Sequence, residues 1–201
     1  MMRIITGSAR GVRLETLLGE EITRPTAERV KEAIFSALQF ELEGRRVLDL
    51  FGGSGQMGLE ALSRGAESCM FVDAAEEAIA VIKRNAQKAR LFDRCRFLIS
   101  DYRNYLRKAR GREKFSLVFL DPPYAMHAHA EALKRLIEGE LVTDDCLFVC
   151  ESGEPDIFAG QEETAALFTT RKTARYTHTY IHILELRKEQ DDENGTDMRQ
   201  L

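Results

Sequence analysis

The stretch that decides the fold reads Arg46-Val-Leu-Asp-Leu-Phe-Gly-Gly-Ser-Gly-Gln-Met-Gly58. Its apolar first half, residues 46–51, predicts a buried strand, and the glycine-rich residues 52–55 predict a tight turn. Residues 57–64 then predict a helix. A strand, a glycine turn and a helix in this order form one β-α unit, and such units build parallel sheets.

Strands and helices keep alternating on either side of this unit. Apolar runs predict further strands at residues 68–73, 96–100, 115–121 and 146–150, and helical periodicity predicts helices at 75–91, 102–109 and 129–138. This alternation is typical of the Rossmann-like α/β class, in which a mostly parallel sheet carries helices on both faces.

The rhythm of the chain changes near its C-terminus. Residues 166–170 and 180–186 predict two successive strands, which form an antiparallel hairpin at the end of the sheet. Because side chains alternate along a strand, Ile181 and Ile183 are expected on one face and Leu184 on the other.

The residues ahead of the first sheet strand predict an addition to the core. Gly7 and Gly11 divide residues 3–14 into short apolar pieces, a pattern typical of a small hairpin. Pro25 and Thr26 predict the start of an amphipathic helix. We therefore expect a small N-terminal hairpin and one helix before the sheet.

The charge of the chain is unevenly distributed. The net charge is −4, but residues 188–201 alone contain five acids and two bases and are expected to form a disordered acidic tail. Contacts to nucleic-acid phosphates depend on local basic patches rather than on net charge. The N-terminal part supplies such candidates, with Lys31 expected beside them on the polar side of the helix: Arg10, Arg13, Arg24 and Arg29.

The segment Asp121-Pro122-Pro123-Tyr124 directly follows a predicted buried strand. Its residue types suit a pocket for a flat ring that bears an amino group. Asp121 can accept one N–H of the amino group and the Pro122 carbonyl the other, since proline fixes φ and removes a competing donor. Tyr124 can stack on the ring, which contributes roughly 1–3 kcal/mol per base. We interpret the segment as a site for methylation of an exocyclic amino group.

The glycine loop is open to a second interpretation. Gly53-Ser-Gly55-Gln-Met-Gly58 matches the dinucleotide-binding pattern, with Asp73 following at the distance typical of nicotinamide enzymes. However, Asp49 precedes the glycines, where its negative charge opposes a pyrophosphate and favours an ammonium group. Hydride transfer also has no use for the Asp121–Tyr124 segment. Methyl transfer from a cofactor that carries an ammonium group is therefore favoured.

The composition fits one cytoplasmic domain. The 201 residues are 44% hydrophobic, and neither a signal peptide nor an apolar run of about 20 residues is present. The four cysteines lack paired spacing, and His178 and His182 do not form a metal signature, so no metal site is expected. The cysteines are interpreted as small buried residues: Cys69, Cys95, Cys146 and Cys150.

Several segments together resemble the RsmD family, the bacterial 16S ribosomal RNA guanine-N2 methyltransferases. The similarity extends from about Arg3 to Glu185, and four pieces carry it: Arg3-Ile-Ile-Thr-Gly7 with Gly11, Arg24-Pro-Thr-Ala-Glu-Arg29, Asp49–Gly55 with Gly58–Gly65, and Asp121-Pro-Pro-Tyr124. The chain departs from the family pattern at Gly52, where alanine is expected, at Gln56, where a small residue is expected, and at Tyr176-Thr177, where a Tyr-Gly pair is expected.

The resemblance implies a single methyltransferase domain over residues 1–187, with residues 1–44 facing RNA and 45–187 forming the catalytic core. It implies S-adenosyl-L-methionine as the cofactor, with Asp49 and the glycine loop at its methionine end, Asp73 at the ribose hydroxyls and Asp101 at the adenine. The residues that the resemblance assigns to the cofactor are Asp49, Phe51, Gly52, Gly53, Gly55, Asp73 and Asp101. It assigns the target guanine to Asp121, Pro122, Pro123 and Tyr124, and RNA contacts to Arg10, Arg13, Arg24, Thr26 and Arg29.

The partner implied by this resemblance is 16S ribosomal RNA, within the assembled small subunit, for a monomeric protein without a metal. Two alternatives stay open beside the nicotinamide enzyme. A DNA adenine-N6 methyltransferase shares the Asp-Pro-Pro-Tyr chemistry, although such enzymes usually need a larger target-recognition region. A non-catalytic ribosome-assembly factor on the same fold would bind small subunits without transferring a methyl group.

Overall fold

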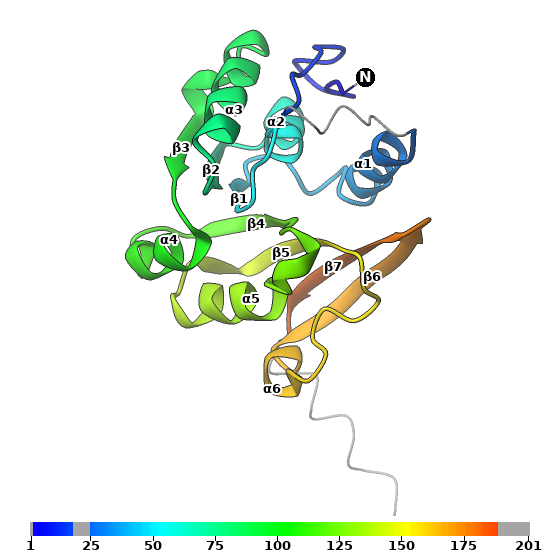
Figure 1. The fold of residues 1–201 in the computed structure, drawn as a ribbon, viewed down its shortest axis with the longest axis vertical. Helices are drawn as coiled ribbons and strands as arrows, with labels where there is room; N and C mark the ends of the chain where they lie inside the picture. Colours follow the sequence, from blue (N-terminus) through cyan, green and yellow to red (C-terminus); the bar gives the residue numbers. More distant parts are fainter. Residues whose placement is uncertain (1, 18–24, 189–201) are drawn as a thin grey trace, which may run out of the picture.

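The computed structural model describes residues 2–17 and 25–188, with only the backbone of 25–27 (Figure 1). Seven strands form one sheet in the order β3-β2-β1-β4-β5-β7-β6. Neighbouring strands from β3 to β5 pair in parallel, whereas β7 is antiparallel to both β5 and β6. The strands are β1 Arg46–Asp49, β2 Ser68–Asp73, β3 Cys95–Ile99, β4 Phe115–Leu120, β5 Val142–Ser152, β6 Phe168–Tyr176 and β7 Thr179–Leu186.

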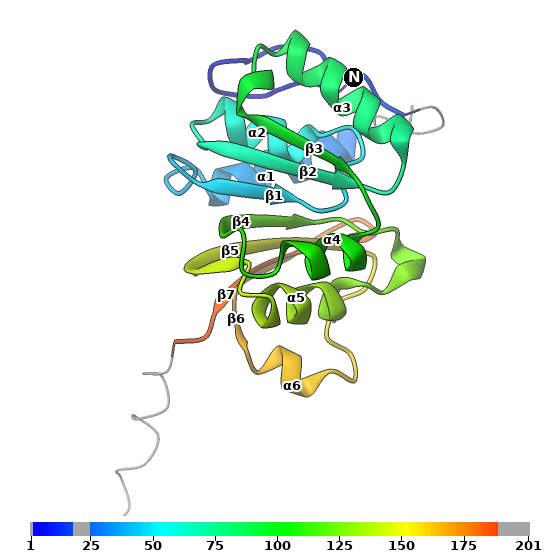
Figure 2. The same cartoon turned by 90° about the vertical axis from the view of Figure 1, so that its left-hand side faces the viewer.

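Helices cover both faces of the sheet, as the alternation predicted (Figure 2). One apolar cluster joins the sheet to α1, α2 and α3, and a second joins it to α4 and α5. Ile181 and Ile183 belong to the first cluster and Leu184 to the second, so the predicted alternation along β7 is confirmed. The helices are α1 Pro25–Ala37, α2 Gln56–Ser63, α3 Glu76–Lys88, α4 Tyr102–Ala109, α5 His129–Glu138 and α6 Glu162–Ala165, with 3-10 turns at Phe92–Arg94 and Tyr124–Met126.

Two strands are longer than their apolar runs. β5 begins at Val142 rather than at Cys146 because Val142 pairs with Phe115 across an irregularity in the β4–β5 register. β6 extends to Tyr176 because its backbone pairs with β7 along its whole length. As the edge strand of the sheet, it can carry polar side chains that stay in contact with solvent. Pairing with a neighbour extends both strands beyond what hydrophobicity alone indicates.

The C-terminal hairpin forms although this chain lacks the glycine that the family resemblance leads one to expect. Tyr176 pairs with Thr179, and Thr177 begins the turn with φ of 57°. Glycine adopts that left-handed backbone without strain, whereas threonine does not. The departure at Thr177 therefore affects the stability of the turn and leaves its register intact.

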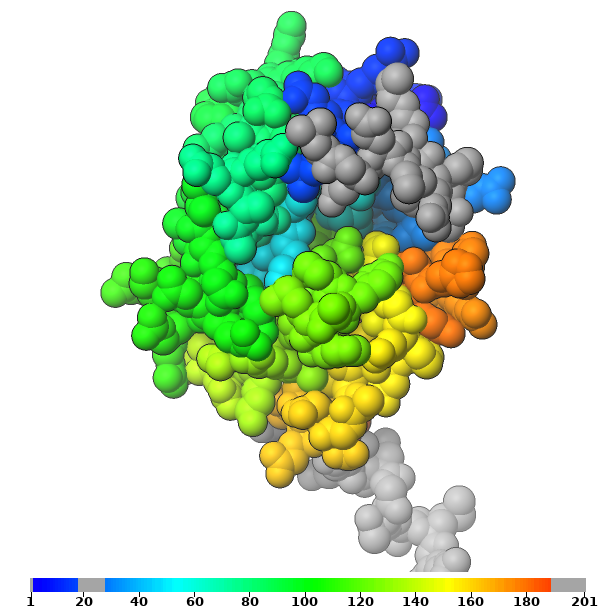
Figure 3. Space-filling model, in the orientation of Figure 1, coloured from blue at the N-terminus to red at the C-terminus, as the bar shows by residue number. Residues whose placement is uncertain are grey.

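The N-terminal hairpin is confirmed in a short form. Arg3 and Arg13 make one antiparallel bridge, and the Gly11 N–H donates to the Ile4 carbonyl over 2.8 Å. Two residues of α2 attach the hairpin to the core. Glu60, fully buried, accepts the backbone N–H groups of Ile5 and Thr6 at 2.7 and 3.0 Å, and the Ser63 hydroxyl accepts the Ala9 N–H over 3.0 Å. The N-terminal segment is thus fixed on α2, and the space-filling view shows it packed against the body of the molecule (Figure 3).

The position expected for Lys31 is wrong. Lys31 is only 3% exposed instead of lying on a solvated helix face. Its Nζ donates to the Arg3 carbonyl over 2.5 Å and lies 3.7 Å from an oxygen of Glu60. The hairpin covers this side of α1, and burial lowers the pKa of the Lys31 ammonium. Arg29 on the same helix is exposed, as expected.

Some residues for which the sequence predicts a role lie outside the part of the chain that the structure describes. Arg24, the Thr26 side chain and residues 189–201 of the expected acidic tail belong to this group. Within residues 2–17 and 25–188, no helix is long and apolar enough to cross a membrane.

Candidate active site

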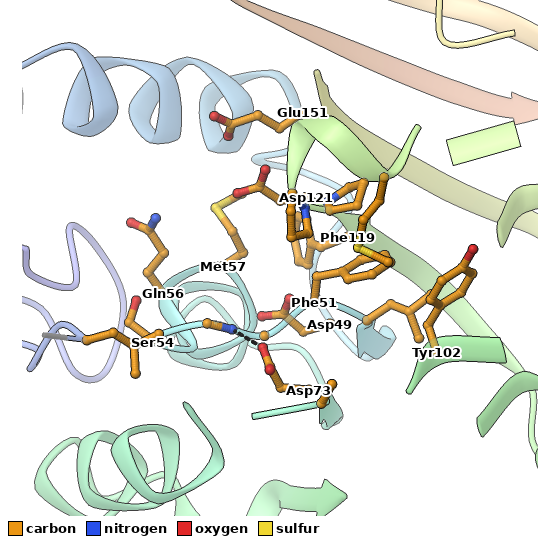
Figure 4. A pocket seen from close by; sticks show the side chains of 18 of the residues that line it. Asp49, Phe51, Ser54, Gln56, Met57, Asp73, Tyr102, Phe119, Asp121 and Glu151 are labelled. Carbon is orange, nitrogen blue, oxygen red and sulfur yellow. Dashed lines mark hydrogen bonds between the residues drawn. The ribbon is translucent and has the colours of Figure 1, made fainter. Parts of the chain in front are cut away.

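A cavity of about 620 Å³ opens at the carboxyl ends of the central strands. It lies where the strand order reverses between β1 and β4, which is the usual position of ligand sites in open α/β sheets. Such a volume fits a cofactor-sized ligand. Figure 4 shows that its walls come from the ends of β1, β2, β4 and β5 and from the start of α2.

Asp49 lies at the end of β1 and lines the cavity from a buried position. One of its carboxylate oxygens accepts the Gly58 N–H of α2 over 3.0 Å. Burial raises the pKa of Asp49 to about 7, against the smaller opposing effect of this hydrogen bond. A cationic group bound next to Asp49 would favour the charged carboxylate, so this end of the cavity suits an ammonium group.

The glycine loop brings backbone close to the cavity. Gly53 and Gly55 have φ of 53° and 78°, and a Cβ on Gly55 would lie 2.9 Å from Ile82 of α3. Gly55 is therefore required by both its conformation and its packing. At Gly52 an added Cβ would be too close only to the terminal methyl of Ile82, at 2.8 Å, with its other neighbours at 3.8 Å, so the alanine expected there would need no more than a side-chain adjustment.

Asp73 and Asp101 line the next part of the cavity. The Asp73 carboxylate, at the end of β2, accepts the Gly53 N–H over 2.9 Å (Figure 4) and also the Ala75 N–H over 2.8 Å. Asp101 caps α4 by accepting the Arg103 N–H over 2.9 Å. Each carboxylate is thus held by backbone donors while it faces the cavity. Two oriented acceptors at this position can bind the hydroxyl and amino groups of a nucleoside.

The segment Asp121–Tyr124 forms the other end of the cavity, directly after β4. Pro122 is buried, whereas the Tyr124 side chain is about half exposed, at 51%. The Tyr124 ring packs on Gly153, where an added Cβ would lie 3.1 Å from it, and the Tyr124 hydroxyl is 3.3 Å from the Thr179 hydroxyl of β7. These contacts hold the ring in place, so that it can present an aromatic face to a base.

The cavity therefore brings the Tyr124 ring together with four of the predicted acids, each at the end of a strand or within two residues of it: Asp49, Asp73, Asp101 and Asp121. Every cofactor-assigned residue except Gly55 borders the cavity, and Gly55 shapes the loop between Gly53 and Gln56 that does. Pro123 also lines the cavity, beside Tyr124. The arginines assigned to RNA that the structure describes do not line it, and all three are exposed: Arg10, Arg13 and Arg29. Their contacts with RNA stay a prediction.

Sequence reasoning missed Glu151, which lines the cavity near the end of β5. Leu120 of β4 pairs with Cys150 of β5, so Asp121 and Glu151 follow at the same level on neighbouring parallel strands. Burial raises the pKa of the Glu151 carboxyl. Glu151 directly follows the apolar run 146–150, just as Asp121 directly follows the run 115–120. Glu151 could have been predicted from this position, but no proline or glycine motif marks it.

A group of three or more histidine, cysteine or acidic side chains that could hold a metal ion is absent from the described part of the chain. All four cysteines are free thiols, and burial raises the pKa of each. They pack as apolar residues, with Cys95 half-buried and the other three buried.

A family model described as "Conserved hypothetical protein 95" matches residues 2–182. A Bacillus subtilis protein named "Putative rRNA methyltransferase YlbH" is 40% identical over 75% of this chain and 82% of its own length. "Ribosomal RNA small subunit methyltransferase D" of Haemophilus influenzae is 32% identical over 75% of this chain and 78% of its own.

Solved structures share the fold. An Escherichia coli structure titled "Putative methyltransferase yhhF" superposes with a TM-score of 0.78 and 25% identity, covering 94% of this chain and 99% of that one. A second structure, titled as "a putative methyltransferase complexed with SAH", has a TM-score of 0.69 over 80% of this chain and 49% of that one. At 14% identity it shows the fold alone.

Proposed function

The chain belongs to the RsmD family of ribosomal RNA methyltransferases, and we propose that it methylates the exocyclic N2 of a guanine in 16S ribosomal RNA. The observation that carries the proposal is the position of Asp121, Pro122 and Tyr124 at one end of a cavity whose other end is built from Asp49, the glycine loop and Asp73. One end fits an amino-bearing base, and the other fits a nucleoside cofactor with an ammonium group.

The cofactor is S-adenosyl-L-methionine, and the residues present fit it. When bound, it supplies an electrophilic methyl group. Asp49 would hold its ammonium group, the backbone at Gly52 and Gly53 its methionine part, Asp73 its ribose hydroxyls and Asp101 its adenine. Asp73 already accepts two backbone N–H groups, so its carboxylate is oriented in advance and loses little entropy on binding.

The target end of the cavity makes the exocyclic nitrogen a better nucleophile. The lone pair of such a nitrogen is delocalised into the ring, so the protein has to favour the pyramidal form. Asp121 accepts one N–H and the Pro122 carbonyl the other, while Tyr124 stacks on the ring. The nitrogen becomes acidic as it gains positive charge, so its proton can leave late, to Asp121 or to water. A strong general base is not required.

The guanine must leave its stacked position to reach this pocket, at a cost of a few kcal/mol. We place the RNA contacts on the N-terminal hairpin and α1, through Arg10, Arg13, Arg24, Thr26 and Arg29. The relative named small subunit methyltransferase D supports 16S ribosomal RNA in the small subunit as the partner. For such a substrate we propose a monomer that acts in the cytoplasm.

Methyl transfer from radiolabelled S-adenosyl-L-methionine tests this function. The acceptors are unmodified small ribosomal subunits, free 16S ribosomal RNA and duplex DNA, and the labelled nucleoside is identified afterwards. N2-methylguanosine in the subunits is the expected product. N6-methyladenine in the DNA would instead support the DNA methyltransferase. Tight binding of subunits without any label, by both the parent protein and Asp121→Ala, would support the non-catalytic assembly factor.

A further inference from the structure

We infer that Glu151 selects guanine over adenine by accepting the N1–H of the target base. This inference rests on the proposed function, because it concerns the base bound at Asp121 and Tyr124. It assigns a role to an acid that neither the Asp-Pro-Pro-Tyr segment nor the glycine loop includes.

The sheet itself places Glu151 beside the target base. Leu120 and Cys150 are partners in the parallel β4–β5 ladder, and Asp121 and Glu151 are the next residues on the two strands. Neighbouring strands lie about 4.8 Å apart, and residues at the same level point to the same face. Both acids line the same cavity, and Figure 4 shows their side chains next to one another above Met57.

The backbone around Glu151 is held from two sides. The buried His129 side chain lies with its Nε2 2.8 Å from the Glu151 carbonyl, and Ile181 pairs with Glu151 from β7. Gly153, two residues further on, supports the ring of Tyr124. Residues 151–153, at the end of β5 and just beyond it, therefore connect the held backbone of Glu151 to the support of the Tyr124 ring.

A carboxylate at this position can distinguish guanine from adenine, because the two purines differ at N1. Guanine presents two donors side by side, N1–H and N2–H, whereas adenine presents an acceptor at N1 beside its amino group. The amino group of guanine is flanked by N1 and N3, and we place the N1 edge toward Glu151 while the amino group is held by Asp121 and Pro122. An ionised Glu151 would accept the N1–H of guanine and would repel the N1 lone pair of adenine. Burial raises the pKa of the Glu151 carboxyl, and an N1–H that donates to it would lower the pKa again by stabilising the charged form.

The test compares two bases that carry the same 2-amino group. Small subunits are reconstituted with either guanine or 2-aminopurine at the nucleotide that receives label in unmodified subunits. 2-Aminopurine keeps the amino group but has an acceptor at N1. We expect wild-type protein to prefer guanine in kcat/KM by about 10- to 100-fold, the usual effect of losing a hydrogen bond to a charged group.

The decisive variant is Glu151→Gln, whose amide has nearly the same shape and can donate to N1. We expect the preference for guanine to fall to about threefold or less, with an unchanged Kd for S-adenosyl-L-methionine that also reports an intact fold. Glu154→Gln is the matched control, because Glu154 lies just beyond β5, is exposed, and lines a neighbouring cavity rather than this one. It should keep the wild-type preference.

An equal preference in wild-type protein and Glu151→Gln would overturn the inference, as would equal rates for both bases in wild type. Either result would leave the proposed function standing, because guanine would still be methylated. If wild-type protein places no methyl group on N2 of guanine in unmodified subunits, the proposed function fails and the assignment of Glu151 fails with it.

Discussion

Asp49→Asn should make the cofactor-free protein more stable relative to wild type as the pH rises. The Asp49 carboxyl is buried, and its pKa is about 7 in the folded protein against 3.8 for an ordinary aspartate. Between these values the folded state binds a proton that the unfolded state has released, so wild-type stability falls with increasing pH. Asparagine has no charge to bury, and its side-chain oxygen can still accept the Gly58 N–H.

The size of the effect follows from the pKa. From pH 5 to the folded value of about 7, each pH unit costs the wild-type protein about 1.4 kcal/mol, so the free energy of unfolding of Asp49→Asn should gain about 3 kcal/mol relative to wild type between pH 5 and pH 8. The cost of burying an amide N–H is the same at both pH values and cancels in this comparison.

Urea unfolding of both proteins at pH 5 and pH 8, without cofactor, measures this difference. Asp144→Asn, at an exposed position of β5, controls for the loss of one negative charge. The same variant, Asp49→Asn, should bind S-adenosyl-L-methionine more weakly at pH 8, because the ammonium group loses its partner. A stability difference between Asp49→Asn and wild type that is equal at both pH values would refute the reasoning.

Three further predictions concern the target site, the N-terminal hairpin and the C-terminal turn. Asp121→Ala should lower kcat by about 100-fold or more with little change in the Kd for S-adenosyl-L-methionine, and equal losses in both would contradict its role. Glu60→Ala should lower the free energy of unfolding in urea by about 3–5 kcal/mol, because Lys31 and two backbone N–H groups lose a buried partner; a loss below about 1 kcal/mol would show that Glu60 does not hold the hairpin on the core. Thr177→Gly should raise the free energy of unfolding by about 0.5–1 kcal/mol, since φ is 57° there, and a destabilised variant would show that the turn is not strained.

Local patterns predicted the core of the fold well. The run 46–58 predicted a strand, turn and helix, and the structure has β1, the glycine loop and α2 there. The strand at 68–73 and the helices at 102–109 and 129–138 have their predicted ends. These elements are buried on one or both faces, so the spacing of their apolar residues is enough to predict them.

Contacts between distant parts of the chain could not be predicted in the same way. Lys31 has the charge and the spacing of a solvated residue, and only the approach of the hairpin and of Glu60 explains its burial. The early start of β5 depends on pairing with Phe115, and the length of β6 depends on β7. Neither the burial of Lys31 nor the lengths of these strands can be predicted from the neighbouring sequence, because the contacting residues lie elsewhere in the chain.

In the candidate site too, some residues could be predicted from local patterns and others depend on contacts between distant parts of the chain. Asp49 and Asp121 could be predicted because each ends an apolar strand next to a recognisable glycine or proline segment, and Asp73 because it ends the next strand at the expected distance from the glycine loop. Glu151 also ends an apolar run, but its position beside Asp121 depends on the pairing of β4 with β5, which the sequence does not specify. The register of the sheet, rather than a motif, brings it into the cavity.

The central claim is tested most directly by the N2-methylguanosine content of 16S ribosomal RNA in cells that lack this protein. Mass spectrometry of the digested RNA should show that N2-methylguanosine decreases on deletion of the gene, returns with the wild-type protein and does not return with Asp121→Ala. An unchanged content of N2-methylguanosine after deletion, or full recovery with Asp121→Ala, would contradict the account.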